Sequence, residues 1–260
     1  MKPNDTSMGG LPRSFPTTIW SDILAAGDVA SPRHREALER LVPTYWKPVY
    51  AYIRLAWHKS VDDSKDFTQE FFSRFLEAGY LSRLRPERGS FRAYLKRALR
   101  HFLVDSKRAE EARRPVTPVF HLDAGPGELE RLGLAAPGET PERAYDREWF
   151  RCLFHASVEA LKQTLDREGK AVYVEVFKSY CLDPLQADDQ APRSTVIRGE
   201  PPAAPTYREI ATRLGLRETD VVNYLHHCRT VLRQIVKEQI RNYVATEEEA
   251  EQEFLEFVGR

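Results

Sequence analysis

The sequence predicts an all-α protein built from two helical domains joined by a flexible linker. Apolar residues recur at helical spacing in several long segments, and a Pro- and Gly-rich stretch at 113–140 interrupts that period. Near the C-terminus two short helical patterns flank a Gly-Leu turn. With 260 residues, 42% of them hydrophobic and 30% charged, the chain has a globular composition and enough length for two compact domains.

The first domain is expected at 17–112, after a loose N-terminal tail at 1–16 that holds Pro, Gly and Ser. A helical pattern from Ser31 to Trp57 is expected to break at Pro43 and Pro48, because proline lacks the N–H that a helix interior uses. Its aromatic side chains are predicted to pack in the core. They are Tyr45, Trp46, Tyr50, Tyr52 and Trp57.

Two amphipathic helices are predicted next in this domain. The segment 66–77 gathers Phe67, Phe71, Phe75 and Leu76 on one face. Ser90 is expected to cap a helix that runs to about residue 112. Its apolar stripe is Phe91, Leu95, Ala98, Leu99, Phe102 and Leu103. From 83 to 114 there are eleven Lys or Arg against four acids, so this segment suits nucleic acid although the whole chain has a net charge of zero.

The second domain is expected at 141–241. Helices are predicted from about Pro141 to Tyr180 with one break near Gly169, and a Pro-rich insert at 183–205 is predicted to be a surface loop. An acidic extension follows at 242–260, with six Glu against one Arg from 246 onward. It is expected to be a solvated helix, the alternative being an acidic cover that competes with DNA for a basic surface.

A helix-turn-helix pattern occupies 206–237. Gly215 stands where a residue tolerant of positive φ ends the first helix, and Arg217 stands where a Ser or Asp cap is usual, so the second helix is expected to be uncapped or to begin near Thr219. Polar residues on the second helix are expected to meet bases and phosphates in a major groove. They are Thr219, Asn223, His226, His227, Thr230, Arg233 and Lys237. The alternative is an ordinary helical hairpin with a solvated face.

Other classes of protein lack support in the sequence. Cys152, Cys181 and Cys228 are odd in number and scattered, which indicates reduced thiols, and no paired zinc-ligand spacing occurs. There is no phosphate loop and no nucleophile–base pair, so we expect neither an enzyme nor a cofactor. An apolar run near the roughly 20 residues of a membrane span is absent, and so is a signal-peptide core. We therefore expect a cytoplasmic protein without a membrane partner.

Two motif blocks resemble the extracytoplasmic-function group of bacterial sigma-70 factors. The first is Asp66-Phe67-Thr68-Gln69-Glu70-Phe71-Phe72, followed by Phe91-Arg92-Ala93-Tyr94-Leu95 and Asp105-Ser106-Lys107-Arg108. The second is Tyr207-Arg208-Glu209-Ile210-Ala211 with Leu214-Gly215-Leu216. The resemblance implies a region 2-like bundle and a region 4-like helix-turn-helix. It also implies a promoter-specificity subunit that binds core RNA polymerase, recognises the −35 element and opens the −10 element.

The resemblance also implies roles for individual residues. The residues that would contact the clamp helices of the largest polymerase subunit are Asp66, Gln69, Glu70 and Arg74. Those that would hold an extruded base of the −10 element are Tyr80, Arg83, Arg85 and Arg88. Those that would bind −10 DNA are Arg92, Lys96, Arg97, Arg100, Lys107 and Arg108, with His101 where the family often has Asn. In region 4 the helix from Thr219 to Lys237 would lie in the major groove of the −35 element, with Asn223, His226 and His227 on bases. The residues that would contact phosphates there are Arg217, Arg229 and Arg233.

The expected partners are core RNA polymerase and promoter DNA, and an anti-sigma or other regulatory protein is a further candidate. The alternative is a stand-alone helix-turn-helix regulator, which would bind duplex DNA without acting as a polymerase subunit. Such a regulator would leave the polar face of the helix at 66–77 without a partner, and that face would then be simply solvated.

Overall fold

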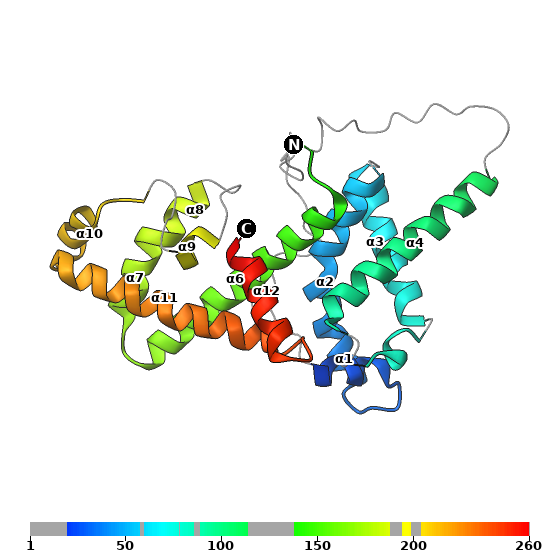
Figure 1. The fold of residues 1–260 in the computed structure, drawn as a ribbon, viewed down its shortest axis with the longest axis horizontal. Helices are drawn as coiled ribbons and strands as arrows, with labels where there is room; N and C mark the ends of the chain where they lie inside the picture. The colour runs from blue at the N-terminus through cyan, green and yellow to red at the C-terminus, as the bar shows by residue number, and fades with distance from the viewer. Residues whose placement is uncertain are drawn as a thin grey trace. The chain divides into compact units, whose positions relative to one another are not determined.

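The computed structural model describes residues 20–57, 60–77, 79–85, 89–113, 138–187, 194–198 and 204–259 (Figure 1). Helices make up the regular structure of this part, and it contains no strand, so the all-α prediction is confirmed. The chain divides into two compact units. The first comprises Met1–Cys152 with Tyr243–Ala245, and the second comprises Leu153–Asn242 with Thr246–Arg260. The predicted tail at 1–16 and most of the predicted linker at 113–140 lie outside the described residues.

The first unit is a helical bundle. Its elements are α1 (Trp20–Gly27), α2 (His34–Trp57), α3 (Val61–Glu77), the 3₁₀ turn η1 (Leu81–Arg83), α4 (Phe91–Arg113) and the start of α6 (Pro141–Arg167). α2 packs against α1, α3 and α4. Gly27 at the end of α1 lies so close to η1 that an added Cβ would meet the carbonyl carbon of Leu81 at 2.8 Å. The glycine therefore allows the two segments to touch.

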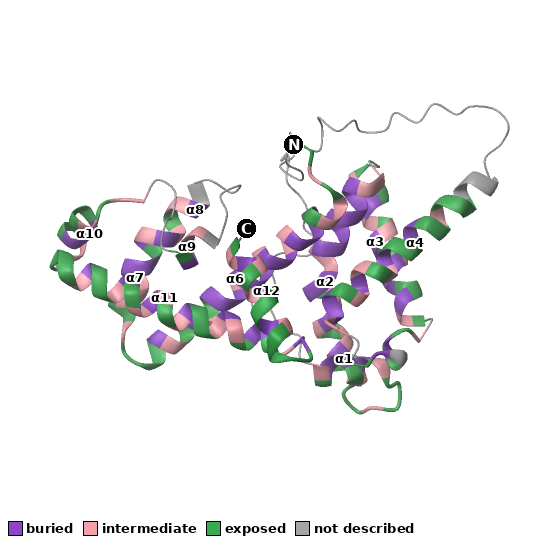
Figure 2. Ribbon diagram, viewed as in Figure 1, coloured by how far each residue is buried: buried purple, intermediate pink, exposed green. Residues whose placement is uncertain are grey.

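The predicted aromatic core is largely confirmed (Figure 2). Tyr45 is fully buried, stacks on Trp149 with 4.8 Å between ring centroids, and meets Phe91 edge-on at 5.0 Å. Tyr50 and Tyr52 are buried as well, whereas Trp46 and Trp57 are only partly covered. The apolar stripe predicted for α4 is buried apart from Ala98, and Ser90 caps the helix by accepting a hydrogen bond from the Ala93 N–H at 3.3 Å.

The predicted break of α2 is wrong. The helix continues from His34 to Trp57 with Pro43 and Pro48 inside it. Each proline removes one backbone hydrogen bond, a loss that helices tolerate where packing compensates. Here both prolines lie in the stretch whose aromatic side chains form the core, so burial of those rings outweighs the missing bonds.

The expected domain boundary at residue 141 also needs correction. Residues 141–152 of α6 belong to the first unit, where Tyr145 and Trp149 are fully buried. Tyr243 returns to the same unit, and the Trp149 indole N–H donates to its hydroxyl at 3.4 Å. Apolar spacing continues through α6 without interruption, so the sequence alone gives no sign of where one unit ends.

The second unit is organised around one long helix, α11 (Glu218–Arg241), drawn in orange in Figure 1. α7 (Ala171–Phe177), α10 (Tyr207–Leu214) and α12 (Glu247–Gly259) each pack against it. The predicted break between α6 and α7 is confirmed at Gly169, which adopts a φ of 70°. A π-helical turn, η3 (Lys178–Leu182), continues α7.

The predicted loop at 183–205 contains two short helices, α8 (Asp183–Ala187) and α9 (Ser194–Arg198). Leu185, Val196 and Ile197 are buried, and α9 packs on α11 and α12. The described part of this insert is therefore a portion of the unit's core. Apolar side chains are sparse among its Pro, Gly and polar neighbours, so no helical period was visible in the sequence.

Candidate functional site

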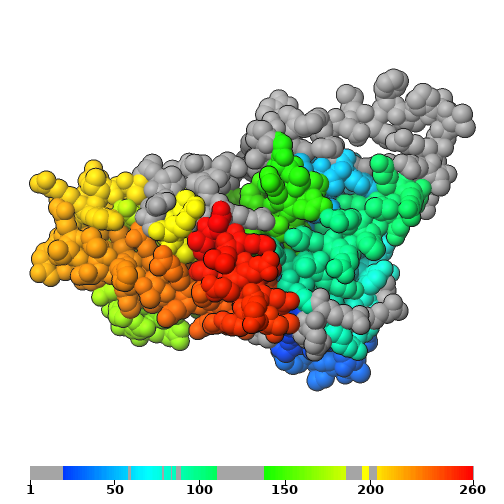
Figure 3. Space-filling model, in the orientation of Figure 1, coloured from blue at the N-terminus to red at the C-terminus, as the bar shows by residue number. Residues whose placement is uncertain are grey.

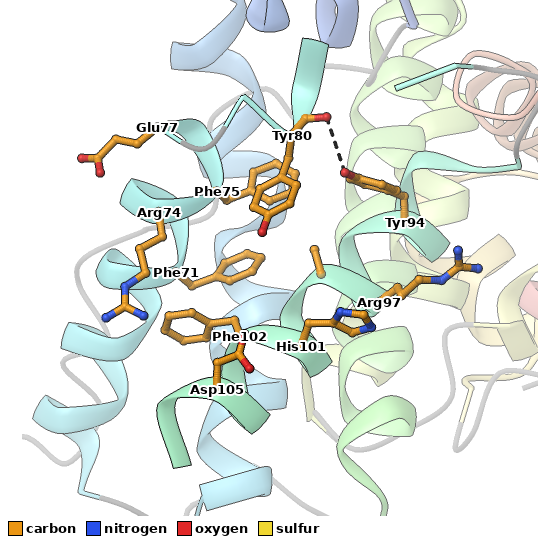
Figure 4. A pocket seen from close by; sticks show the side chains of 11 residues that line it. Phe71, Arg74, Phe75, Glu77, Tyr80, Tyr94, Arg97, His101, Phe102 and Asp105 are labelled. Atoms are coloured by element: carbon orange, nitrogen blue, oxygen red, sulfur yellow. Dashed lines mark hydrogen bonds between the residues drawn. The ribbon is translucent and has the colours of Figure 1, made fainter. Parts of the chain in front are cut away.

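A cavity of about 600 Å³ opens between α3 and α4 in the first unit (Figure 4). This volume falls within the roughly 300–1,000 Å³ of typical small-molecule sites. Residues that are three or four apart on each helix line it, because such residues share a helix face. They are Phe71, Arg74, Phe75 and Glu77 of α3, Tyr80 before η1, and Tyr94, Arg97, Ala98, His101, Phe102 and Asp105 of α4.

Aromatic rings form the walls of this cavity and hold one another in place. Phe71 meets Phe102 edge-on with 5.5 Å between centroids, and Phe75 stacks with Tyr80 at 5.8 Å. The Tyr94 hydroxyl donates to the carbonyl oxygen of Tyr80 at 3.4 Å, which ties α4 to the segment before η1. Figure 4 shows the Tyr80 ring reaching down toward the phenylalanines. The cavity is therefore preformed and offers flat apolar surfaces.

Polar side chains stand around these rings. Arg74 forms an ion pair with Glu70, and its guanidinium lies 5.5 Å from the centroid of Phe102. Within the described residues, the side chains of Arg97, His101 and Asp105 make no hydrogen bond or ion pair. All three are exposed and can reach a bound molecule. An aromatic cavity ringed by unpaired donors and acceptors can hold a planar polar ring, and it shows no nucleophile placed beside a base.

Three basic side chains predicted to bind −10 DNA instead contact the start of α6. Arg92 Nη1 and Lys96 Nζ both donate to Asp146 Oδ1, at 2.9 Å and 2.8 Å. Arg100 Nη2 donates to Glu142 Oε1 at 3.0 Å, and the Tyr52 hydroxyl donates to the same oxygen. All of these residues belong to the first unit. The basic residues of α4 therefore divide into one stripe that faces α6 and another that faces the cavity and solvent.

The pair Arg92 and Asp146 is part of the core. Their side chains are only 5% and 7% exposed, and the Arg92 guanidinium also lies 5.0 Å from the centroid of Phe150. Arg92 is thus withdrawn from solvent, contrary to its expected place on a DNA-binding surface. A buried charge must be paired, and this pairing fixes α4 to α6.

Arg100 and Glu142 form a more exposed pair. Partial burial acts to raise the pKa of Glu142, but the backbone hydrogen bond and those from Arg100 and Tyr52 hold it below its ordinary value. The hydrogen bond to Glu142 raises the pKa of Arg100. The pair is therefore ionised at neutral pH.

The other residues predicted to contact the −10 element differ in their exposure and in their contacts. Tyr80 is in the cavity wall, and Lys107 and Arg108 are exposed on α4. Arg85 Nη1 donates to the carbonyl oxygens of Leu84 and Ser82, which holds it against its own turn. The side chains of Arg83 and Arg88 lie outside the described residues.

The face of α3 that was predicted to contact polymerase points toward solvent. Asp66, Gln69 and Arg74 are exposed, and Glu70 is partly covered. On the apolar face predicted for this helix, Phe71 and Phe75 are buried, whereas Phe67 and Leu76 are only partly covered. Phe72, which the pattern did not place on that face, is buried as well. Arg74 belongs both to this face and to the cavity lining.

In the second unit, α10 and α11 form two helices joined by a tight turn. Thr206 begins α10 with a capping box: it accepts from the Glu209 N–H at 3.3 Å, and Glu209 accepts from the Thr206 N–H at 2.7 Å. Gly215 ends α10 with a φ of 67°, which confirms the predicted turn. α11 begins at Glu218 and not near Thr219, but its N-cap residue Arg217 makes no side-chain cap hydrogen bond, as the uncapped alternative predicts. Asp220 accepts from the Arg217 N–H at 3.3 Å.

The residues predicted to meet the −35 element fall into two groups. Arg217, Thr219, Asn223 and His226 are exposed near the start of α11, and Arg217 pairs with Asp220. The others contact their own unit: His227 Nε2 lies 3.2 Å from Lys170 Nζ, the Arg229 guanidinium lies 5.5 Å from the Tyr180 ring centroid, and Arg233 Nη2 donates to the Ile197 carbonyl oxygen at 2.6 Å. The contacts of His227 and Arg233 lie away from the exposed start of the helix, whereas Nε and Nη2 of Arg229 are buried without a hydrogen-bond partner in the described part of the chain.

The acidic helix α12 packs on the far end of α11 (Figure 3). Glu251 accepts from Lys237 Nζ at 2.9 Å, and Glu247 accepts from Arg241 Nη2 at 2.5 Å, a contact that lowers the pKa of Glu247. Lys237 lies 18 residues beyond Thr219, roughly 27 Å along the helix at 1.5 Å per residue. The acidic cover considered from the sequence therefore engages cations remote from the exposed start of α11.

The cysteines and acids give no sign of a second kind of site. Cys152, Cys181 and Cys228 are buried, and burial raises the pKa of each thiol to about 12. Across the described ranges, no group of three or more His, Cys, Asp or Glu side chains is placed to hold a metal ion. In the same ranges, no helix combines the length and apolarity of a membrane span.

The features described so far define an all-helical protein with an aromatic cavity in one unit and an exposed helix start in the other. Comparison with known proteins finds no matching family model, no matching curated protein and no matching solved structure.

The sequence did not predict the cavity. Their spacing predicts that Phe71, Phe75 and Phe102 are core residues, and Asp105 stands out in the sequence only as part of the Asp105-Ser106-Lys107-Arg108 motif. Periodicity indicates which residues share a face of α3 and which share a face of α4. It does not specify the distance between the two helices, and that distance decides whether a cavity forms between the faces.

Proposed function

We propose that this chain is a promoter-specificity subunit of RNA polymerase, a sigma factor that acts in the cytoplasm without catalytic chemistry of its own. The α3–α4 cavity is the observation that carries this proposal. Its aromatic walls suit an unstacked nucleobase, and stacking on an aromatic side chain contributes roughly 1–3 kcal/mol per base. Separation of the two DNA strands at the −10 element supplies such a base.

The charges around the cavity fit a single strand of DNA. Arg97 is unpaired within the described residues, and Lys107 and Arg108 are exposed farther along α4. These cations would bind the phosphates on either side of a captured base. Arg92 and Lys96 would fix α6, so the proposed −10 contacts become Tyr80, Arg97, His101 and the exposed end of α4.

The second unit would bind the duplex of the −35 element through the start of α11. Thr219, Asn223 and His226 present hydroxyl, amide and imidazole groups to solvent, the kinds of group that meet base edges in a major groove. Arg217 stands beside them and would contact a phosphate after exchanging its partner Asp220.

The solvent-facing residues of α3 would bind core polymerase. Asp66 and Gln69 are exposed on a helix whose opposite face is buried, so an external partner can reach them. A stand-alone regulator would give this face no role. An anti-sigma or other regulatory protein remains a candidate partner for the same surfaces.

Run-off transcription tests the proposal. Core polymerase stripped of sigma is combined with the full chain and a library of genomic promoters, and discrete transcripts are expected only when the chain is present. The variant Arg97→Ala should lower transcript yield while core binding is kept, whereas Asp66→Ala should weaken core binding. Glu159→Ala, on the part of α6 within the second unit, is the control. Binding to a palindromic duplex without any binding to core would instead support the stand-alone regulator.

A further inference from the structure

The cavity between α3 and α4 contains a carboxylate that the proposed function leaves unexplained. Asp105 lies one turn after His101 on α4, and Figure 4 shows its carboxyl group beside the Phe102 ring. Within the described residues it has no hydrogen bond or ion pair. A site intended only to attract phosphates would gain nothing from a negative charge at this point.

The chemistry of a carboxylate restricts what it can bind. An ionised carboxylate accepts hydrogen bonds and donates none. Cytosine, adenine and guanine carry an exocyclic amine that donates, and Asp or Glu accepting from the cytosine amine is an established mode of base recognition. Thymine has no exocyclic amine: its one donor at this edge is the N3–H, which lies between two carbonyl oxygens that repel a carboxylate. An unpaired carboxylate beside an aromatic wall therefore distinguishes bases by their amines.

We propose that Asp105 makes the α3–α4 cavity select an amino-bearing base over thymine in single-stranded DNA. This inference rests on the proposed function, because it assumes that a base enters the cavity. His101 and Tyr80 complete the edge of the site, with an imidazole and a hydroxyl that can adapt to the neighbouring ring atoms. Asp105 therefore acts as a specificity-determining residue.

The second acid of the cavity provides a matched control. Glu77 belongs to the lining, but Figure 4 shows its side chain directed away from the rings. Glu77→Gln and Asp105→Asn remove the same charge from the same rim. If a carboxylate acted only by repelling phosphates, both changes would strengthen binding of every strand equally, whereas base selection by Asp105 changes the ratio between bases.

The experiment measures fluorescence anisotropy of the full chain with dye-labelled single strands. Each strand carries one base flanked by abasic sites, the base being cytosine, adenine, guanine, thymine or 2-pyrimidinone, which is cytosine without its amine. The wild-type chain is expected to bind the amino-bearing bases roughly 10-fold more tightly than thymine, as expected of one charge-assisted hydrogen bond. 2-Pyrimidinone should bind like thymine. Asp105→Asn should reduce the ratio to below about 3-fold, and Glu77→Gln should keep it.

Three results would overturn the inference: equal binding of all bases by the wild-type chain, an unchanged ratio in Asp105→Asn, or tight binding of 2-pyrimidinone. Circular dichroism of each variant confirms that it is folded. Run-off transcription separates this failure from failure of the proposed function, since transcripts that depend on the chain together with equal binding of all bases refute only base selection. Absence of transcripts, of core binding and of any strand binding refutes both.

Discussion

Replacing Asp146 by Asn should strongly destabilise the first unit. Asp146 Oδ1 accepts hydrogen bonds from both Arg92 and Lys96, and the Arg92 side chain is only 5% exposed. Asn has nearly the same shape but no charge, so Arg92 would remain buried without its counter-charge. Breaking a buried pair in this way costs about 3–5 kcal/mol. This is a large part of the roughly 5–15 kcal/mol that stabilises a typical domain.

The exposed pair on the same helix provides the comparison. The side chains of Glu142 and Arg100 are 40% and 65% exposed, so Glu142→Gln should cost only about 0–1 kcal/mol. Urea unfolding followed by tryptophan fluorescence measures both changes. All four tryptophans, Trp20, Trp46, Trp57 and Trp149, belong to the first unit, so the signal reports this unit. With a slope of about 1–3 kcal/mol per molar urea, Asp146→Asn should lower the midpoint by at least about 1 M.

A further variant separates charge pairing from packing. The double change Arg92→Met with Asp146→Leu removes both buried charges and keeps apolar volume, so it should be far less harmful than Asp146→Asn alone. If Asp146→Asn and Glu142→Gln differ by less than about 1 kcal/mol, the pair is not a buried anchor. Arg92 would then return to the candidates for DNA contact.

Three other outcomes are expected. Gly27→Ala should destabilise the first unit by about 1–3 kcal/mol, because its Cβ would meet Leu81 at 2.8 Å, whereas Gly259→Ala, which has open space, should not; urea midpoints compare them. Mass spectrometry should find the three buried thiols unmodified by iodoacetamide at pH 8 until urea unfolds the unit that holds each, since burial raises their pKa to about 12. Labelling under native conditions would contradict this. The hydrogen bonds from the Thr206 backbone and side chain lower the pKa of Glu209, so its stabilising effect is present above the unfolded pKa of about 4.3 and is lost as pH falls through the lower folded pKa. The stability difference between wild type and Glu209→Gln, followed by circular dichroism, should therefore shrink in acid, and a constant difference from pH 7 to 3 would count against the capping role.

Most helices could be predicted from the sequence because their buried faces repeat with the helical period. The stripe of α4, the Ser90 cap and the turns at Gly169 and Gly215 are all local properties of the chain, and the structure confirms them. Pro43 and Pro48 misled the prediction because the loss of a backbone hydrogen bond is local, while the burial that offsets it comes from distant residues.

The candidate site was less predictable because a sequence pattern identifies a helix face but not what lies against it. Arg92 and Arg97 look equivalent in the basic stripe of α4, yet one pairs with Asp146 in the core and the other lines the cavity. Likewise, the sequence predicts Arg233 as a phosphate contact, but its guanidinium donates to the Ile197 carbonyl oxygen of α9. The sequence did not indicate the position of α9.

The return of Tyr243 to the first unit has a consequence for synthesis of the chain. A ribosome completes residues 1–152 well before it reaches Tyr243–Ala245, and at about 5–20 residues per second the intervening segment takes roughly 5–20 seconds. During this interval Trp149 lacks the hydroxyl partner and ring contact that Tyr243 later provides. Most of the first unit is thus synthesised first, but its contacts with Tyr243–Ala245 can form only after most of the second unit has been made.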